Sequence, residues 1–284
     1  MRLIKKIGVV GAGSMGQGIA QVCAAAGYSV LFYDVNSLAI ERGIAAITKS
    51  LDQAVAKGKL SEDQKKSTLS IIYPVAFENL QADLIIEAVV EQLEVKQNLF
   101  SRLEKINRAE TILASNTSSL SISKMASVLE RPGRFIGLHF FNPAHLMKLV
   151  EVVAGGQTDL SLNFLMIDFC KSIGKIPVVV KDSPGFIVNR VARHYYLESL
   201  KLLEEDVADI GTIDALTKSA GFKLGPFELM DLIGNDVNLE VSRLMYESFD
   251  RTPRFKPNRI QEEKVRLNQL GKKTGKGYYA YDPK

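Results

Sequence analysis

The feature that most constrains this chain is a glycine-rich turn between an apolar strand and a helix. The turn reads Gly11-Ala12-Gly13-Ser14-Met15-Gly16, and it lies between the apolar run 7–10 and the helical pattern of residues 15–26. The first glycine permits a tight bend, the second lets a pyrophosphate approach the backbone, and the third lets the helix pack on the strand. The helix N-terminus then offers N–H groups to phosphate. The turn predicts a dinucleotide-binding βαβ unit; the alternative is a tight turn that binds nothing.

The type of dinucleotide is indicated by Asp34, which ends the second apolar run, residues 30–33. A carboxylate at this place accepts hydrogen bonds from the ribose hydroxyls of NAD and repels the 2′-phosphate of NADP. Val35 and Asn36 offer no cation for that phosphate, although Arg42 lies further along. NAD is therefore expected as the cofactor, and the alternative is an aspartate that caps a loop or a helix.

The rest of the first half repeats the alternation of strand and helix. Further apolar runs lie at residues 84–90, 112–114, 134–138, 150–153 and 177–180. Helical patterns separate several of them, at 93–106 and after Ser37, which is expected to cap its helix. Residues 57–67 and 73–79 look like excursions from this pattern. Continuous apolar strands between helices predict a mostly parallel sheet covered on both faces.

The second half changes character at residues 181–185, a polar stretch that contains a Pro-Gly break. The segments beyond it have helical spacing, at residues 186–205, 213–219, 238–248 and 261–270. We therefore predict a Rossmann-type α/β domain over residues 1–183 and an all-α domain over residues 184–284.

Composition excludes several other classes of protein. Hydrophobic residues make up 46% and charged residues 24%, which excludes disorder for most of the chain, and no apolar run reaches the roughly 18–20 residues of a membrane helix. Lys and Arg are spread along the chain with a net charge of +4, so nucleic-acid binding is not expected. Without a signal peptide, Cys23 and Cys170 are expected to be buried thiols in the cytoplasm. Two cysteines and three histidines fit no zinc motif, so no metal is expected.

Polar clusters follow three successive strands, where ligands bind in sheets of this kind. Glu91 follows residues 84–90, with Lys96 five residues on; the cluster 115–119 (SNTSS) and the cluster 139–143 (HFFNP) follow the next two strands. Each cluster alone is consistent with a solvated turn or a helix cap. Together they favour one shared site.

Within that site, His139 and Glu151 form the sharpest candidate pair. Glu151 interrupts the apolar strand Leu149-Val150-Glu151-Val152-Val153, and a buried carboxylate is costly unless it is paired. His139 on the neighbouring strand is a plausible partner, because a carboxylate orients an imidazole and raises its basicity. The alternatives are a core histidine and a solvent-facing glutamate on an edge strand. Asn189, at the start of the helical domain, is by itself an ordinary helix-surface amide.

These residues together resemble the 3-hydroxyacyl-CoA dehydrogenase family, and most closely its short bacterial 3-hydroxybutyryl-CoA members. The matching segments extend over nearly the whole chain, in the family's order and spacing: GAGSMGQGIAQ from Gly11, EAVVEQLEVK from Glu87, ASNTSSL from Ala114, GLHFFNPAHLMKLVEVV from Gly137, DSPGFIVNR from Asp182, GPFELMDLIGND from Gly225 and GKKTGKGYYAY from Gly271. One departure is Ala144-His145, where relatives often carry a small apolar residue and a proline. It puts the acyl-chain preference in doubt.

The resemblance implies oxidation of an (S)-3-hydroxyacyl-CoA, with a role for each matching residue. The implied catalytic residues are His139 as the base, Glu151 as its partner, Ser118 against substrate and cofactor, and Asn189 at the substrate oxygen. The implied NAD contacts are Gly11, Ala12, Gly13, Ser14, Met15, Gly16, Asp34, Glu91, Lys96, Ser118, Asn142 and Lys273. The implied contacts with acyl-CoA are Ser50, Lys57, Ser118 and Asn189. The family also implies a homodimer formed through the helical domain.

Three other readings remain open at this point. A related dehydrogenase could act on a free 3-hydroxy acid or sugar acid without CoA. A sensing or structural protein could bind NAD without catalysis, although the His139–Glu151 pair speaks against it. NADPH-dependent biosynthetic reduction would keep the same chemistry, and Asp34 argues against that reading.

Overall fold

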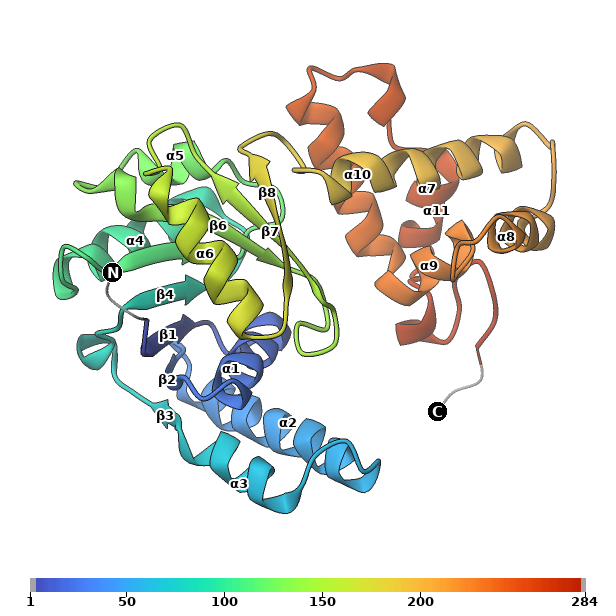
Figure 1. The fold of residues 1–284 in the computed structure, drawn as a ribbon. Helices are drawn as coiled ribbons and strands as arrows, with labels where there is room; N and C mark the ends of the chain where they lie inside the picture. Colours follow the sequence, from blue (N-terminus) through green and yellow to red (C-terminus); the bar gives the residue numbers. More distant parts are fainter. Residues whose placement is uncertain (1–3, 282–284) are drawn as a thin grey trace. The chain divides into compact units, whose positions relative to one another are not determined.

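The computed structural model describes residues 4–281, which form two compact units, and the chain passes from the first to the second between Ser183 and Pro184. This is the position at which the sequence analysis places the domain boundary. The first unit is α/β and the second is helical (Figure 1).

One eight-stranded sheet organises the first unit, in the order β3-β2-β1-β4-β5-β6-β7-β8. All neighbouring strands are parallel except the antiparallel pair β6 and β7. This confirms the Rossmann-type fold with a mostly parallel sheet. The strand order reverses between β1 and β4, and in such sheets the crevice at the carboxyl ends of these strands binds the ligand. The strands are β1 (Lys6–Val10), β2 (Ser29–Tyr33), β3 (Ile72–Pro74), β4 (Leu84–Glu87), β5 (Ile112–Ser115), β6 (Phe135–Phe140), β7 (Leu149–Ala154) and β8 (Ile176–Lys181).

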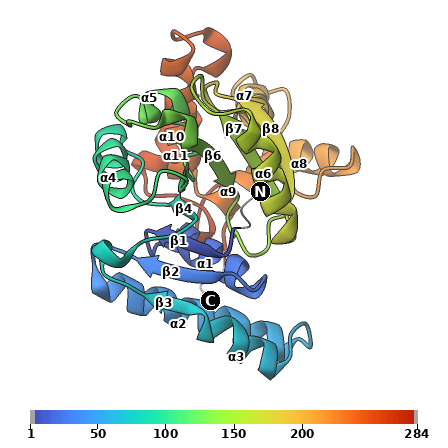
Figure 2. The same cartoon turned by 60° about the vertical axis from the view of Figure 1, so that its left-hand side comes forward.

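Helices cover both faces of this sheet. They are α1 (Ser14–Ala25), α2 (Ser37–Ala56), α3 (Glu62–Ser70), α4 (Leu93–Ile106), α5 (Ile122–Ala126) and α6 (Ser161–Ser172). Side chains of α1, α2 and α6 share one buried apolar cluster with the sheet. On α4, Phe100 packs edge-on against Phe135 of β6, with ring centroids 4.6 Å apart. Figure 2 shows α4 and α5 on one side of β6 and α6 on the other.

A row of polar residues lies on the α4 and α5 face of the sheet. Alternate residues of a strand point to opposite faces of the sheet. The residues that point toward α1 and α6, and belong to the apolar cluster shared with these helices, include Ile86, Ala114, Leu138 and Val150. The intervening positions therefore face α4 and α5. We call the polar ones, Glu87, Ser115, His139 and Glu151, the polar row. In the strand register Glu87 pairs with Ser115, and His139 pairs with Glu151.

The second unit is helical, as predicted, and packs around its own apolar cluster. Its helices are α7 (Val188–Glu204), α8 (Ile210–Ser219), α9 (Pro226–Ile233), α10 (Asn235–Ser248) and α11 (Arg259–Arg266). Phe227 of α9 and Leu200 of α7 are fully buried in the cluster. Within the described part of the chain, no helix has the length and apolar character needed to cross a bilayer.

Several local predictions were wrong. Asn36, not Ser37, caps α2, because its side chain accepts a hydrogen bond from the N–H of Leu38. Helix α7 begins at Val188 rather than at residue 186, since Phe186 has a φ of 51°. Strand β3 and helix α3 occupy segments read as excursions, and α9 was not predicted. These elements are short, and α3 is polar except where it packs on α1, so they carry little periodic signal.

Candidate active site

The glycine-rich turn joins β1 to α1 with the backbone geometry that its glycines predict. Gly11 has a φ of +103°, and a Cβ on Gly16 would overlap the carbonyl oxygen of Gly11. Gly13, by contrast, has open space where its Cβ would be, and no side chain caps the start of α1 there. The first N–H groups of α1 therefore lack a side-chain acceptor at an exposed backbone, which suits a bound phosphate.

Asp34 ties the end of β2 to this turn. Its Oδ2 accepts a hydrogen bond from the N–H of Ala12 at 2.7 Å, and its Oδ1 accepts one from the N–H of Asn36 at 2.9 Å. The N–H of Ala12 is thus engaged by the protein, which leaves the N–H groups further along the turn to meet a pyrophosphate. A carboxylate oxygen can accept more than one hydrogen bond, so Asp34 can also bind ribose hydroxyls.

A cavity of about 720 Å³ opens beside Asp34 at the carboxyl ends of β1, β2 and β4. Its lining includes Gly11, Gly13 and Asp34 together with the apolar side chains of Val35, Val90, Val95 and Leu99. A turn suited to phosphate, a carboxylate suited to ribose hydroxyls and apolar side chains suited to a base line this one cavity. The residues present therefore fit NAD.

The structure brings the predicted pair together in the polar row. His139 and Glu151 are 6% and 1% exposed, and His139 Nδ1 lies 2.7 Å from Glu151 Oε2. The antiparallel register of β6 and β7 places them directly opposite each other. His139 lies within β6 rather than after it, and β7 is an inner strand, so Glu151 is not the solvent-facing edge residue of the alternative reading. The pairing is a structural fact, and its catalytic role stays a prediction.

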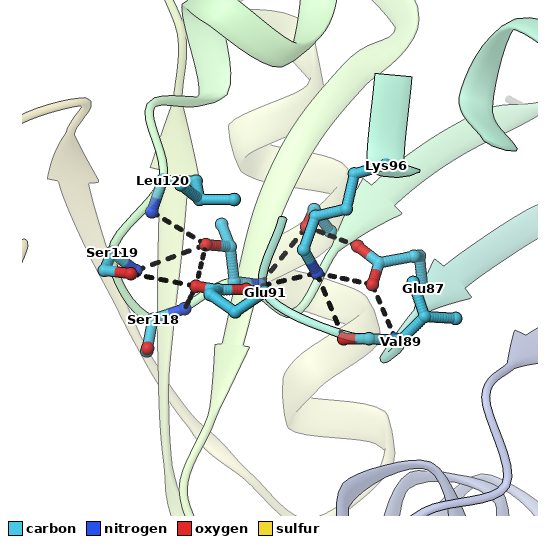
Figure 3. A network of polar contacts seen from close by, with 9 residues as sticks. Glu87, Val89, Glu91, Lys96, Ser118, Ser119 and Leu120 are labelled. Carbon is cyan, nitrogen blue, oxygen red and sulfur yellow. Dashed lines mark hydrogen bonds and ion pairs between the residues drawn. The ribbon is translucent and has the colours of Figure 1, made fainter. Parts of the chain in front are cut away.

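Glu91 connects two of the three polar clusters. Its Oε1 accepts hydrogen bonds from Thr117 Oγ1, from the Ser118 N–H at 3.0 Å and from Ser119 Oγ at 2.9 Å (Figure 3). Burial by itself would raise the pKa of Glu91, but Lys96 and the hydroxyls of Thr117 and Ser119 outweigh it and hold that pKa below its usual value. Glu91 therefore stays ionised and fixes the loop that carries Ser118.

Lys96 lies behind Glu91, between two carboxylates. Its Nζ is 2.5 Å from Glu87 Oε1 and 3.2 Å from Glu91 Oε2 (Figure 3). Glu87 also accepts hydrogen bonds from Ser115 Oγ and the Val89 N–H, both at 2.6 Å. Lys96 is 1% exposed and Glu87 is fully buried. The predicted NAD contact at Lys96 thus belongs to an amine that already holds two carboxylates of the protein.

Glu87 is the member of this site that sequence reasoning missed. It interrupts the apolar run Leu84-Ile85-Ile86-Glu87-Ala88 in the same way that Glu151 interrupts its strand. The argument that a buried carboxylate needs a partner would have singled it out. Burial raises the pKa of Glu87 although Lys96, Ser115 and the Val89 N–H all favour its charged form.

The third polar cluster is held by its neighbours. Asn116 Oδ1 accepts a hydrogen bond from the N–H of Phe140 at 2.9 Å, which joins the cluster 115–119 to β6. Beyond β6, the buried Lys175 donates from Nζ to the carbonyl oxygens of Ala144 and Met147, at 2.5 and 2.8 Å. These bonds fix the loop that contains the exposed Asn142. His145 lies in the same loop, where burial and the nearby Lys175 lower its pKa.

The remaining predicted residues belong to elements other than the strands that carry the polar row. Ser50 is half-buried on α2, and Lys57 is exposed at the C-cap of that helix. Asn189 is the second residue of α7, and Lys273 forms an ion pair with Asp236 at 2.6 Å, both in the second unit. Their roles toward a ligand remain predictions.

Comparison with known proteins shows relatives along the whole described chain. The profile described as the NAD binding domain of 3-hydroxyacyl-CoA dehydrogenase matches residues 6–183, and that of its C-terminal domain matches residues 185–281. The chain is 45% identical, over 97% of its length, to 3-hydroxyadipyl-CoA dehydrogenase of Escherichia coli (strain K12), and it spans 59% of that protein. It is 40% identical to 3-hydroxybutyryl-CoA dehydrogenase of Clostridioides difficile, covering 98% of this chain and 99% of the relative.

The structure is also similar to that of (S)-3-hydroxybutyryl-CoA dehydrogenase from Ralstonia eutropha. The TM-score is 0.94 at 39% sequence identity, with 99% of this chain and 100% of the other covered. The resemblance seen in the sequence is confirmed, and NAD is the cofactor that the first unit binds. The chain belongs to the 3-hydroxyacyl-CoA dehydrogenase family of NAD-dependent oxidoreductases.

Proposed function

We propose that this protein catalyses the reversible oxidation of (S)-3-hydroxyacyl-CoA to 3-oxoacyl-CoA, with 3-hydroxybutyryl-CoA as the substrate. The observation that carries the proposal is the buried contact of 2.7 Å between His139 and Glu151 at the carboxyl end of β6. Cofactor binding alone does not require such a pair. The names of the relatives from Clostridioides difficile and Ralstonia eutropha support the choice of substrate.

His139 acts in this proposal as the general base and acid. Because Nδ1 is engaged by Glu151, Nε2 is the ring nitrogen that takes the proton of the substrate 3-hydroxyl. Glu151 fixes the ring orientation and balances the positive charge that forms on the imidazole. In the reverse direction His139 returns the proton to the oxygen at C3. Proton transfer of this kind contributes roughly 10²–10⁴ to the rate.

The other residues bind and orient the reactants. Ser118 and Asn189 donate hydrogen bonds to the substrate oxygen, on which negative charge develops as the proton leaves. Bound NAD supplies the acceptor for the hydride that leaves C3. Glu91 holds the Ser118 backbone N–H at 3.0 Å, so the serine is positioned before substrate arrives. Ser50 and Lys57 bind the CoA portion.

The helical unit has a second role in the proposal, as the dimerisation and substrate-capping domain. Val191 of α7, Leu216 of α8 and Val237 of α10 are exposed apolar side chains, which supports contact with another surface. Both cysteines are free and buried, in keeping with a cytoplasmic protein. Sedimentation equilibrium tests the dimer, and a monomer at micromolar concentration would contradict it.

The loss of NADH absorbance at 340 nm tests the reaction. Acetoacetyl-CoA with NADH should be consumed rapidly, and free acetoacetate or NADPH only slowly. Activity on the free acid alone would assign the protein to dehydrogenases that act without CoA. NADH binding without activity on either substrate would favour a sensing protein and contradict the role of His139.

A further inference from the structure

The NAD cavity contains a cation that the proposed mechanism does not use. Arg102, on the exposed side of α4, lines the cavity together with Asp34 and Val35. Its guanidinium lies over the ring of Phe77, with 4.2 Å between Cζ and the ring centroid. Among residues 4–281, Arg102 has no hydrogen bond or ion pair with a protein group. Five N–H donors are thus held at the cavity without a protein acceptor.

Phe77 fixes where those donors lie. It starts a short 3₁₀ turn, Phe77–Asn79, just after β3, and its ring packs edge-on against Tyr33 at 5.5 Å. Tyr33 in turn precedes Asp34, so the stack of Arg102, Phe77 and Tyr33 stands directly beside the ribose-binding carboxylate. The quadrupole of an aromatic ring attracts a cation over its face, which favours this one placement of the long Arg102 side chain.

The chemistry of the cavity indicates which part of NAD meets Arg102. The turn from Gly11 to Gly16 takes the pyrophosphate and Asp34 takes the ribose, so the group beyond Asp34 is the purine base. The walls offered by Val35, Val90 and Leu99 suit the flat faces of a purine. A purine edge carries ring nitrogens that accept hydrogen bonds, and Arg102 presents donors at the rim of the same pocket.

We propose that Arg102 binds the adenine ring of NAD, with its guanidinium stacked on Phe77 and an N–H group donating to a ring nitrogen. The proposal rests on NAD as the cofactor and adds a residue that selects the base. A 2′-phosphate is the competing ligand for an arginine here. The carboxylate of Asp34, which lines the same cavity, disfavours it by repulsion between like charges.

Binding measurements without substrate test this proposal. Calorimetry should show that Arg102→Met weakens NADH and AMP about tenfold, and that the affinity for reduced nicotinamide mononucleotide, which lacks adenine, is unchanged. Lys105→Met is the matched control: the same charge is lost from the exposed side of α4 outside the cavity, and NADH affinity should stay within about twofold. Thermal unfolding checks that both variants fold.

Two results would overturn the assignment. Equal weakening of NADH and reduced nicotinamide mononucleotide would mean that Arg102 supports the site as a whole. Weakening of NADPH alone, with AMP unaffected, would mean that Arg102 serves a phosphate. Neither result depends on acetoacetyl-CoA, so failure here is distinguishable from failure of the proposed reaction.

Discussion

The two ends of the polar row each bury a carboxylate, and each end pairs its carboxylate with a different side chain. Glu87 on β4 and Glu151 on β7 are both carboxylates on inner strands, on the same face of the sheet, with essentially no exposure. Glu151 meets the imidazole of His139 on the adjacent strand. Glu87 meets the ammonium of Lys96, which reaches it from α4.

The two partners have different consequences. Lys96 contacts two carboxylates, those of Glu87 and Glu91, so this end of the row holds β4, α4 and the loop with Ser118 in place. An imidazole is the side chain whose ordinary pKa lies nearest neutrality, so the other end of the row carries a group suited to proton transfer. A buried carboxylate thus marks each end of the row, and the side chain paired with it decides whether that end supports the fold or is suited to proton transfer.

The largest expected effect comes from removing the reactive partner. His139→Gln should lower kcat for acetoacetyl-CoA reduction by roughly 10²–10⁴, because the glutamine amide exchanges no proton with the substrate. NADH affinity, measured by calorimetry, should stay within about twofold. The control is His145→Gln, in the neighbouring loop, for which kcat should fall less than about threefold. An equal loss of NADH affinity in His139→Gln would contradict a role confined to proton transfer.

Removing the supporting partner should act on stability instead. Lys96→Met leaves the buried Glu87 without its cation, which costs about 3–5 kcal/mol for a pair of this kind. Urea unfolding measures this change in the free energy of unfolding. Lys201→Met is the matched control, because Lys201 forms an exposed ion pair with Glu205 and should cost less than about 1 kcal/mol. Equal losses in the free energy of unfolding would show that the buried Glu87–Lys96 pair contributes no more to stability than an exposed ion pair.

A milder change at the reactive end sharpens the comparison. Glu151→Gln keeps an oxygen that can accept the Nδ1–H of His139 but removes the negative charge that balances the imidazolium. We expect kcat to fall roughly 10–100-fold, less than for loss of the base itself. The KM for NADH is the internal control and should not change. A wild-type kcat in this variant would remove Glu151 from the mechanism.

The smallest expected effect is a pH dependence at the supporting end. Because burial raises the pKa of Glu87, the folded state binds more protons than the unfolded chain from the ordinary glutamate range, about 4.3, up to the folded pKa. This contribution to stability is complete below that range and is lost as the pH rises through the folded value. The free energy of unfolding of the wild type, relative to that of Glu87→Gln, should therefore fall as the pH rises from 4 to 8. The control Glu41→Gln, an exposed position, should show no such trend.

Features that depend on one short, continuous segment of the chain were predictable from the sequence. Three features have such a local pattern: the turn at Gly11, the boundary at residue 183 and the apolar strand that Glu151 interrupts. In a mostly parallel sheet, the strand to which a residue belongs also fixes where the residue lies. His139 could be paired with Glu151 because adjacent strands in the chain are often adjacent in the sheet.

Features that depend on distant segments were not predictable in the same way. Arg102 meets Phe77 only because α4 lies alongside the segment that follows β3, and no periodicity in either segment encodes that contact. Helix α9 is only eight residues long, so its apolar residues repeat too few times to indicate a helix from the sequence. The Glu87–Lys96 pair was predictable only in part. The apolar strand around Glu87 reveals the buried carboxylate in the sequence, but nothing in that strand indicates that Lys96 is its partner.

Single-turnover stopped flow tests most directly the claim that chemistry and support lie at opposite ends of the row. Enzyme saturated with NADH is mixed with acetoacetyl-CoA, and the first-order loss of absorbance at 340 nm is recorded for wild type, His139→Gln and Lys96→Met under conditions where all three are folded. We expect a rate at least about 100-fold lower than wild type for His139→Gln and within about fivefold of wild type for Lys96→Met. A wild-type rate in His139→Gln, or an equal loss in both variants, would contradict it.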